Sequence, residues 1–144
     1  MTVAAILKHK GHEVISVGPE TSVAEISHVL TDRRIGAVLV LDGEEQLLGI
    51  VSERDIVHSL AANGGRTLDM TAGQLMTRVV RTVTPSTTVL QAMTTMTAGR
   101  MRHLPVVERG HLIGMVSIGD VVKARIMQQD YEVDSLRAYV AGAA

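Results

Sequence analysis

The stretch Gly49-Ile-Val-Ser-Glu-Arg-Asp55 decides the fold, because it recurs as Gly114-Met-Val-Ser-Ile-Gly-Asp120. Both copies carry Gly, Ser and Asp at the same three positions. A second matching pair lies upstream, Val17-Gly-Pro-Glu-Thr-Ser-Val23 and Val83-Thr-Pro-Ser-Thr-Thr-Val89. Self-similarity at a fixed offset is the signature of a duplicated supersecondary unit. The sequence therefore predicts two similar subdomains related by a pseudo-two-fold axis.

Each copy predicts the same order of elements: a short strand, a helix, a β-hairpin and a second helix. In the first copy these are a strand over 13–17, a helix opening at Ser22, a hairpin of 36–41 with 47–51, and a helix over 53–63. In the second copy they are a strand over 79–83, a helix opening at Thr88, a hairpin of 103–107 with 112–116, and a helix from 118 onward. The fold class is therefore α/β (α+β), with two β-α-β-β-α units.

The first helix of each copy begins at a capping-box sequence. Ser22 with Glu25 and Thr88 with Gln91 have the S/T-x-x-E/Q spacing in which two side chains satisfy the free N–H groups of a helix start. Apolar residues follow at helical spacing and predict the buried faces. These are Val23, Ile26, Val29 and Leu30 in the first copy, and Val89, Ala92, Met93 and Met96 in the second.

Residues 64–69 are expected to link the copies. Residues 71–76 should form a turn of helix leading into the second copy, with residues 2–8 as their counterpart. We expect domains over 1–66 and 67–130, and a C-terminal helical extension over 131–144. That helix meets no breaker before Gly142, and Ile126, Val133, Leu136 and Val140 fall at heptad-like spacing. They form either a seam in a homodimer or a face that packs back on the same chain.

Composition excludes several classes of function. The 144 residues include no cysteine, tryptophan or phenylalanine, and the formal net charge is −1. Nucleic-acid binding needs clustered cations or aromatic stacking platforms, so no nucleic-acid partner is expected. The absence of cysteine rules out disulfides and thiolate metal sites. The longest apolar run, 37–41, cannot span a bilayer, so we expect a cytoplasmic protein without membrane insertion.

The sequence gives no sign of an enzyme. The histidines lack the H-x-x-x-H and H-E-x-x-H spacings of metal sites. Nucleophile elbows, P-loops and G-x-G-x-x-G fingerprints are also missing. We expect no catalytic residues, no metal and no catalytic cofactor.

The Gly-Ser-Asp segments fit two interpretations. A strand that delivers Ser to a helix start, with Asp in the first turn, provides backbone N–H groups for a phosphate and a carboxylate for ribose hydroxyls. The same spacing is also a plain capping box that needs no ligand.

In tandem, these segments resemble the cystathionine-β-synthase (CBS) domain pair, or Bateman module, in its stand-alone bacterial form. Met101-Arg-His-Leu-Pro-Val-Val107 resembles the second-strand motif of the same family. The resemblance covers roughly residues 3–129. It implies a shallow disc in which two small sheets face each other, with up to two clefts for adenosine ligands.

The resemblance also implies a role for each site residue. Asp55 and Asp120 would hold ribose, and Ser52 and Ser117 would meet phosphate. The residues flanking the base would be Ser16, Val17 and Ala37 in the first copy, and Arg81, Thr82 and His103 in the second. Arg54, Arg102 and His103 would neutralise phosphate; the alternatives are solvated surface charges for the arginines and a structural hydrogen bond for the histidine. Because these basic positions differ between the copies, the clefts should be unequal.

The implied function is regulatory. The module would sense AMP, ADP, ATP or NAD(H) as a homodimer and act on a separate, unknown protein. The alternatives are an assembly module that binds no nucleotide and a module that binds S-adenosylmethionine.

Overall fold

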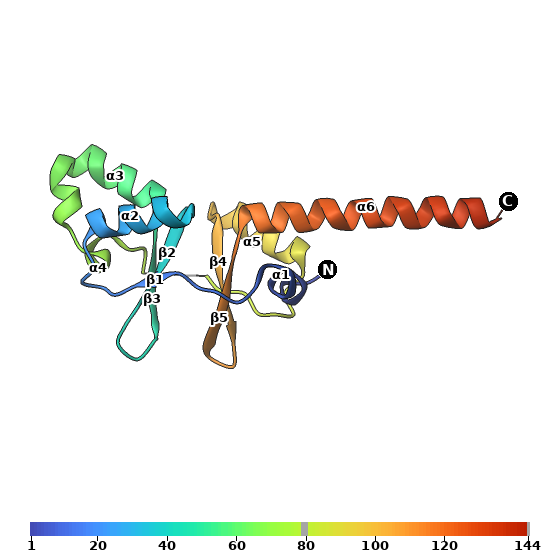
Figure 1. Ribbon diagram of the computed structural model, residues 1–144, viewed down its shortest axis with the longest axis horizontal. Coiled ribbons are helices and arrows are strands. Elements are labelled where there is room, and N and C mark those ends of the chain that lie inside the picture. The colour runs from blue at the N-terminus through green and yellow to red at the C-terminus, as the bar shows by residue number, and fades with distance from the viewer. Residues whose placement is uncertain (79–80, 144) are drawn as a thin grey trace. The chain divides into compact units, whose positions relative to one another are not determined.

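The computed structural model describes residues 1–78 and 81–143, and it contains the mixture of helices and small sheets that the repeat predicts (Figure 1). The chain divides into two compact units. One is Val14–Arg81, and the other combines Met1–Glu13 with Thr82–Ala144. None of the described helices is long and apolar enough to cross a membrane.

The unit Val14–Arg81 contains a three-stranded sheet in the order β1-β2-β3. β1 pairs parallel with β2, and β2 pairs antiparallel with β3. Its helices lie on one side of that sheet (Figure 1). In chain order the elements are β1 (Ser16–Val17), α2 (Val23–Arg33), β2 (Ala37–Leu41), β3 (Leu47–Ser52), α3 (Glu53–Asn63), the 3₁₀ helix η1 (Gly64–Asp69) and α4 (Ala72–Leu75).

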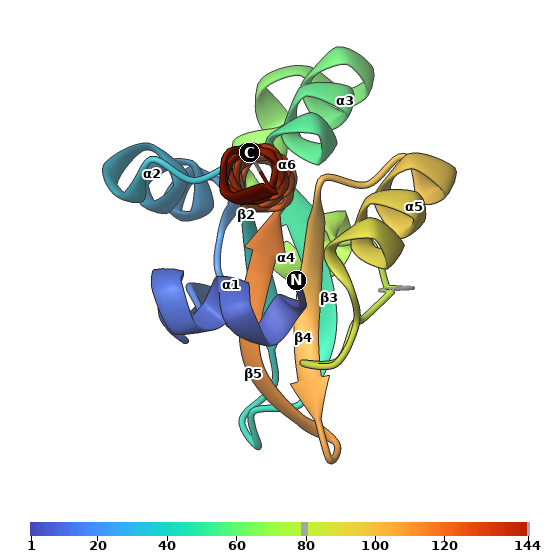
Figure 2. The ribbon, with the colours of Figure 1, turned by 90° about the vertical axis from the view of Figure 1, so that its right-hand side faces the viewer.

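The other unit has a two-stranded antiparallel sheet, β4-β5, with α1, α5 and α6 on one side of it (Figure 2). Its elements are α1 (Val3–Lys10), α5 (Val89–Gly99), β4 (His103–Glu108), β5 (His111–Ser117) and α6 (Ile118–Ala143). Val83 joins this sheet through a single parallel bridge to Val106. The unit thus repeats the helix and hairpin of the first, as the duplication predicts.

The predicted apolar stripes form the cores. Each helix buries three of its four predicted residues and leaves one, Val29 or Met93, half-buried against its cluster. The capping box of α5 is complete, because Thr88 and Gln91 exchange both bonds. In α2 the Ser22 hydroxyl accepts a hydrogen bond from the Glu25 backbone N–H.

Three predicted segments differ from the structure. The strand expected over 13–17 is limited to Ser16–Val17. Of the strand expected over 79–83, residues 79 and 80 lie outside the described residues and Val83 forms only the bridge. The expected linker 64–69 is a 3₁₀ helix, held by a buried hydrogen bond between the Ser59 and Thr67 hydroxyls at 2.9 Å. The pattern of hydrophobic residues does not predict a buried polar pair of this kind.

The two predicted lead helices both form, and each packs in a different unit. α4 lies with the first repeat, whereas α1 lies with the second, where the Val3 N–H donates to the Thr87 carbonyl at 2.8 Å. The division at residues 66 and 130, which followed the sequence repeat, stays a prediction.

Candidate functional site

The unit Val14–Arg81 brings four predicted site residues to one end of its sheet. Ala37, at the start of β2, stands opposite Ser52, at the end of β3. Ser16 of β1 is in register with Leu39, two residues further along β2. Asp55 follows Ser52 in the first turn of α3. The sheet register therefore assembles this group from three separate strands and a helix.

Ser52 and Asp55 hold each other in a complete capping box. The Ser52 backbone N–H and hydroxyl donate to Asp55 Oδ2 at 2.8 and 3.0 Å, and the Asp55 N–H donates to the Ser52 hydroxyl at 3.3 Å. Both side chains are half-buried. Within the described parts of the chain, these bonds reach only Oδ2. The Asp55 Oδ1 atom is therefore the one positioned to accept from a ligand hydroxyl.

The second unit repeats this geometry at the start of α6. His103 stands opposite Ser117, as Ala37 does opposite Ser52. The Ser117 N–H donates to Asp120 Oδ2 at 2.8 Å, and the Asp120 N–H donates to the Ser117 hydroxyl at 3.2 Å.

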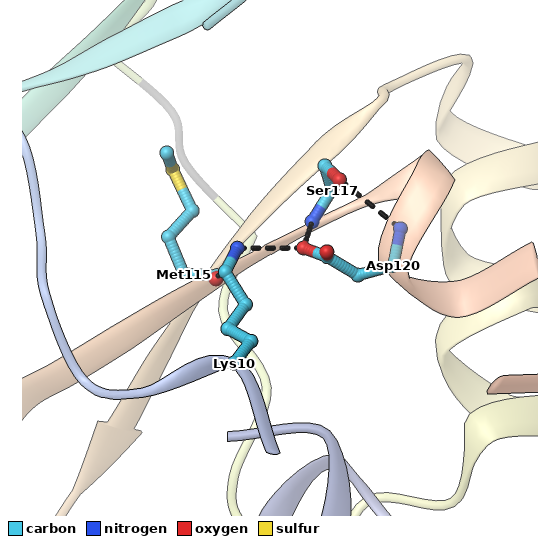
Figure 3. A network of polar contacts seen from close by, with 4 residues as sticks. All are labelled: Lys10, Met115, Ser117 and Asp120. Carbon is cyan, nitrogen blue, oxygen red and sulfur yellow. Dashed lines mark hydrogen bonds and ion pairs between the residues drawn. The ribbon is translucent and has the colours of Figure 1, made fainter. Parts of the chain in front are cut away.

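Lys10 of α1 distinguishes the second site from the first (Figure 3). Its ammonium group donates to Asp120 Oδ2 at 2.6 Å and to the Met115 carbonyl at 2.9 Å. Burial raises the pKa of Asp120, but the hydrogen bond and charge of Lys10 and the hydrogen bonds from Ser117 outweigh it, so the pKa lies below its ordinary value. A ligand at Asp120 would meet a carboxylate that already has a cationic partner.

Replacing Lys10 by methionine should therefore lower stability more at neutral pH than in acid. The side chains of Lys10 and Asp120 are 36% and 25% exposed, so we expect a loss of about 0.5–1 kcal/mol. The folded-state pKa of Asp120 is depressed, so the stabilisation is present above the ordinary aspartate value of about 3.9 and disappears as pH falls through the folded value. Urea unfolding at about pH 7 and about pH 3 measures this.

Lys8→Met is the matched control, because Lys8 is an exposed lysine on the same helix. It should leave stability unchanged at both pH values. Equal losses from Lys10→Met at the two pH values, or equal losses from the two variants, would contradict the assigned ion pair.

The helix starts offer fewer free donors than the sequence suggests. The Glu53 N–H donates to the Gly36 carbonyl at 3.0 Å, and its counterpart on Ile118 donates to the Arg102 carbonyl at 2.7 Å. The third N–H of each helix bonds to the capping serine. Among the first three backbone N–H groups of each helix, these contacts leave one unused, that of Arg54 in α3 and that of Gly119 in α6. Phosphate binding here therefore needs the nearby arginine side chains as well.

The two strand glycines have a packing role. A Cβ on Gly49 would stand 2.7 Å from the Thr77 carbonyl oxygen, and one on Gly114 would stand 2.8 Å from Leu7 Cδ2. Gly49 thus lets the chain just after α4 lie against β3, and Gly114 lets α1 lie against β5. The close approach that a strand glycine indicates is therefore to the protein itself, and the glycines are not evidence for a ligand.

The other predicted site residues lie on these elements or just before them. Arg54 is exposed in the first turn of α3, and Arg102 is exposed just before β4. Arg81 and Thr82 are exposed ahead of the Val83 bridge, and Val17 is half-buried against the core of its unit. His103 is half-buried at the start of β4.

Lys10 is a site residue that the sequence did not indicate. It is separated from Asp120 by 110 residues, and nothing in its local sequence marks it. The described residues contain no group of three or more His, Asp or Glu side chains that could hold a metal ion.

Comparison with known proteins places this geometry in a family. The CBS domain model matches residues 5–62 and 72–127. The CBS domain-containing protein CBSX3, mitochondrial, of Arabidopsis thaliana is 36% identical over 149 residues, covering 98% of this chain and 72% of that protein. The crystal structure of the CBS-domain protein ATU1752 from Agrobacterium tumefaciens is 44% identical, covers 86% of this chain and 92% of that one, and has a TM-score of 0.85.

Two further solved structures are described with bound ligands. The CBS domain protein PAE2072 from Pyrobaculum aerophilum, complexed with AMP, is 25% identical over 83% of this chain and 89% of that one, with a TM-score of 0.73. The CBS domain pair of MJ0100, in complex with 5′-methylthioadenosine and S-adenosyl-L-methionine, is 25% identical over 86% of this chain and 98% of that one, with a TM-score of 0.76. With two matches to the family model and a relative that spans nearly its whole length, this chain belongs to the CBS domain family.

Proposed function

We propose that this chain is a regulatory module that binds an adenosine-bearing ligand at the starts of α3 and α6. The observation that carries the proposal is the repeated Ser-Asp pair. In each unit a strand ends in a serine beside a half-buried aspartate whose bonds reach only Oδ2. The second carboxylate oxygen is suited to accept from the vicinal hydroxyls of a ribose.

AMP in PAE2072, and 5′-methylthioadenosine and S-adenosyl-L-methionine in MJ0100, all contain adenosine. This supports an adenosine ligand here, with AMP, ADP, ATP, NAD(H) and S-adenosylmethionine as the candidates. In the first unit Ser16, Val17 and Ala37 would flank the base. In the second sequence repeat Arg81, Thr82 and His103 would do so. Arg54, Arg102 and His103 would face phosphate.

The ligand would act by shifting a conformational equilibrium rather than by taking part in a reaction. It regulates only if it binds two arrangements of the module with different affinities. We propose that the module is a homodimer and passes this bias to a separate protein. The expected cytoplasmic location stays a prediction.

Calorimetric titration of ligand-stripped protein with AMP, ADP, ATP, NADH and S-adenosylmethionine tests the proposal. We expect saturable binding of at least one compound, and we expect guanosine 5′-monophosphate, as a base-specificity control, to bind much more weakly. Because Lys10 already pairs with Asp120, the site at Asp55 should fill first. Failure of every adenosine compound to bind would overturn the proposal.

The same titration examines the alternative, an assembly module without nucleotide. The completed capping boxes and the Lys10 ion pair favour it, since both satisfy the site residues from within the chain. A folded protein that binds none of the compounds would support this alternative.

A further inference from the structure

The C-terminal half of helix α6 extends beyond the sheet and the other helices of its unit (Figure 1). The whole helix runs from Ile118 to Ala143, and every described side chain from Gln129 to Gly142 is exposed. Figure 2 shows the helix end-on. Isolated helices are marginal in water. A helix of this length therefore calls for a partner.

The first turns of α6 show which side faces its own unit. Val121 and Ala124 are buried there. A different set of apolar side chains lies about a third of a turn away around the helix and remains exposed. This stripe consists of Val122 (44% exposed), Ile126 (53%), Val133 (47%), Leu136 (63%) and Val140 (60%).

The stripe repeats with the 3.5-residue spacing of a coiled coil. Ile126, Val133 and Val140 are separated by seven residues each and occupy the a positions of a heptad. Val122, Gln129 and Leu136 occupy the d positions. β-branched residues at a with leucine at d favour two parallel strands; here all three a positions are β-branched, and Leu136 is the leucine among the three d positions.

The charges beside the stripe also match a parallel pair. In parallel coiled coils a g position lies beside the following e position of the partner. Arg125 and Glu132 occupy g positions, while Asp130 and Arg137 occupy e positions. Pairing two copies in register therefore places Arg125 beside Asp130 and Glu132 beside Arg137, and both pairs have opposite charge.

We propose that α6 pairs with α6 of a second copy of this chain as a parallel, in-register, two-stranded coiled coil. The seam consists of Val122, Ile126, Gln129, Val133, Leu136 and Val140. This inference rests on the proposed homodimer and is independent of nucleotide binding. It fixes the dimer's orientation, because the two C-termini lie side by side.

Site-directed cross-linking tests the seam cleanly, because the chain contains no cysteine. In the full-length protein, Gln129→Cys places a thiol opposite its own copy in the parallel seam. Tyr131→Cys is the matched control, since Tyr131 is two residues away at the outward f position and is 73% exposed. We expect a dimer in sedimentation velocity, rapid oxidative cross-linking of Gln129→Cys, and little cross-linking of Tyr131→Cys.

Two outcomes would overturn the inference in distinguishable ways. If the protein is a dimer but both cysteine variants cross-link equally slowly, the α6 seam is wrong and the proposed homodimer is retained. If the protein is a monomer, both the seam and the proposed homodimer are wrong. In either case calorimetry with nucleotides reports separately on the proposed function.

A charge-reversal pair tests the orientation. Glu132→Arg should raise the dimer dissociation constant about tenfold by placing two arginines together, and the double variant E132R/R137E should recover to within about twofold. In an antiparallel pair Arg137 would lie near Asp130 instead, so the double variant would not recover. Absence of recovery would overturn the parallel register.

Discussion

Replacing Asp55 by alanine is expected to weaken adenosine-ligand binding at the first site by about ten- to a hundredfold. The variant removes the half-buried carboxylate proposed to accept from the ribose, and hydrogen bonds to a charged group contribute about 1.5–3 kcal/mol. Asp120→Ala should have a smaller effect, because Lys10 already pairs with that carboxylate. Calorimetry with the tightest-binding adenosine compound measures both effects.

Because Asp55 also caps α3, a matched control must separate capping from binding. Gln91→Ala removes the same half of a complete capping box in α5, a helix that contributes none of the candidate site residues. Each variant should cost about 1 kcal/mol of stability, but only Asp55→Ala should weaken binding. If Asp55→Ala binds the ligand like the original chain, the ribose assignment is wrong.

Replacing Gly49 by alanine is expected to lower the free energy of unfolding more than the same replacement at Gly114 or Gly43. The new Cβ would stand 2.7 Å from the Thr77 carbonyl oxygen, which accepts the Ile50 N–H at 3.2 Å, while the Thr77 N–H donates to the Ile50 carbonyl at 2.9 Å. Backbone held by two hydrogen bonds cannot move aside cheaply, so we expect a loss of about 2–3 kcal/mol in urea unfolding.

Two other glycines provide graded controls. Gly114→Ala meets the buried side chain of Leu7 instead of backbone, so it should cost less than Gly49→Ala. Gly43→Ala meets no atom within 4 Å and should be neutral. If Gly49→Ala were no more destabilising than Gly114→Ala, the packing role assigned to Gly49 would be wrong.

The repeat made most of the fold predictable. Apolar spacing and capping residues located α2, α3 and α5, and the bounds of α3 agree with the expected 53–63. The same signals failed at residues 64–69, where a buried Ser59–Thr67 hydrogen bond supports a 3₁₀ helix. They also placed more residues in the opening strand than β1 contains, because pairing with β2 is decided by long-range contacts.

The candidate sites were only partly predictable. The Ser-Asp spacing identified both capping boxes, because their bonds are local. The Lys10–Asp120 pair depends on the packing of α1 against the second repeat, and no local pattern reports such a contact. The strand glycines were visible in the sequence, but only the structure shows that they make room for Thr77 and Leu7.

Nuclear magnetic resonance of the backbone amides during a titration with AMP tests the central claim most directly. At 15.4 kDa the chain is small enough to resolve individual amides. The account predicts shifts at Ser52 to Asp55, and at Ser117 to Asp120 as the second site fills. The matching capping boxes at Thr71 and Thr88 should remain unchanged. If the amide signals of both Ser-Asp segments stay unshifted at saturating AMP, or if only signals from other parts of the chain shift, the proposed binding site is wrong.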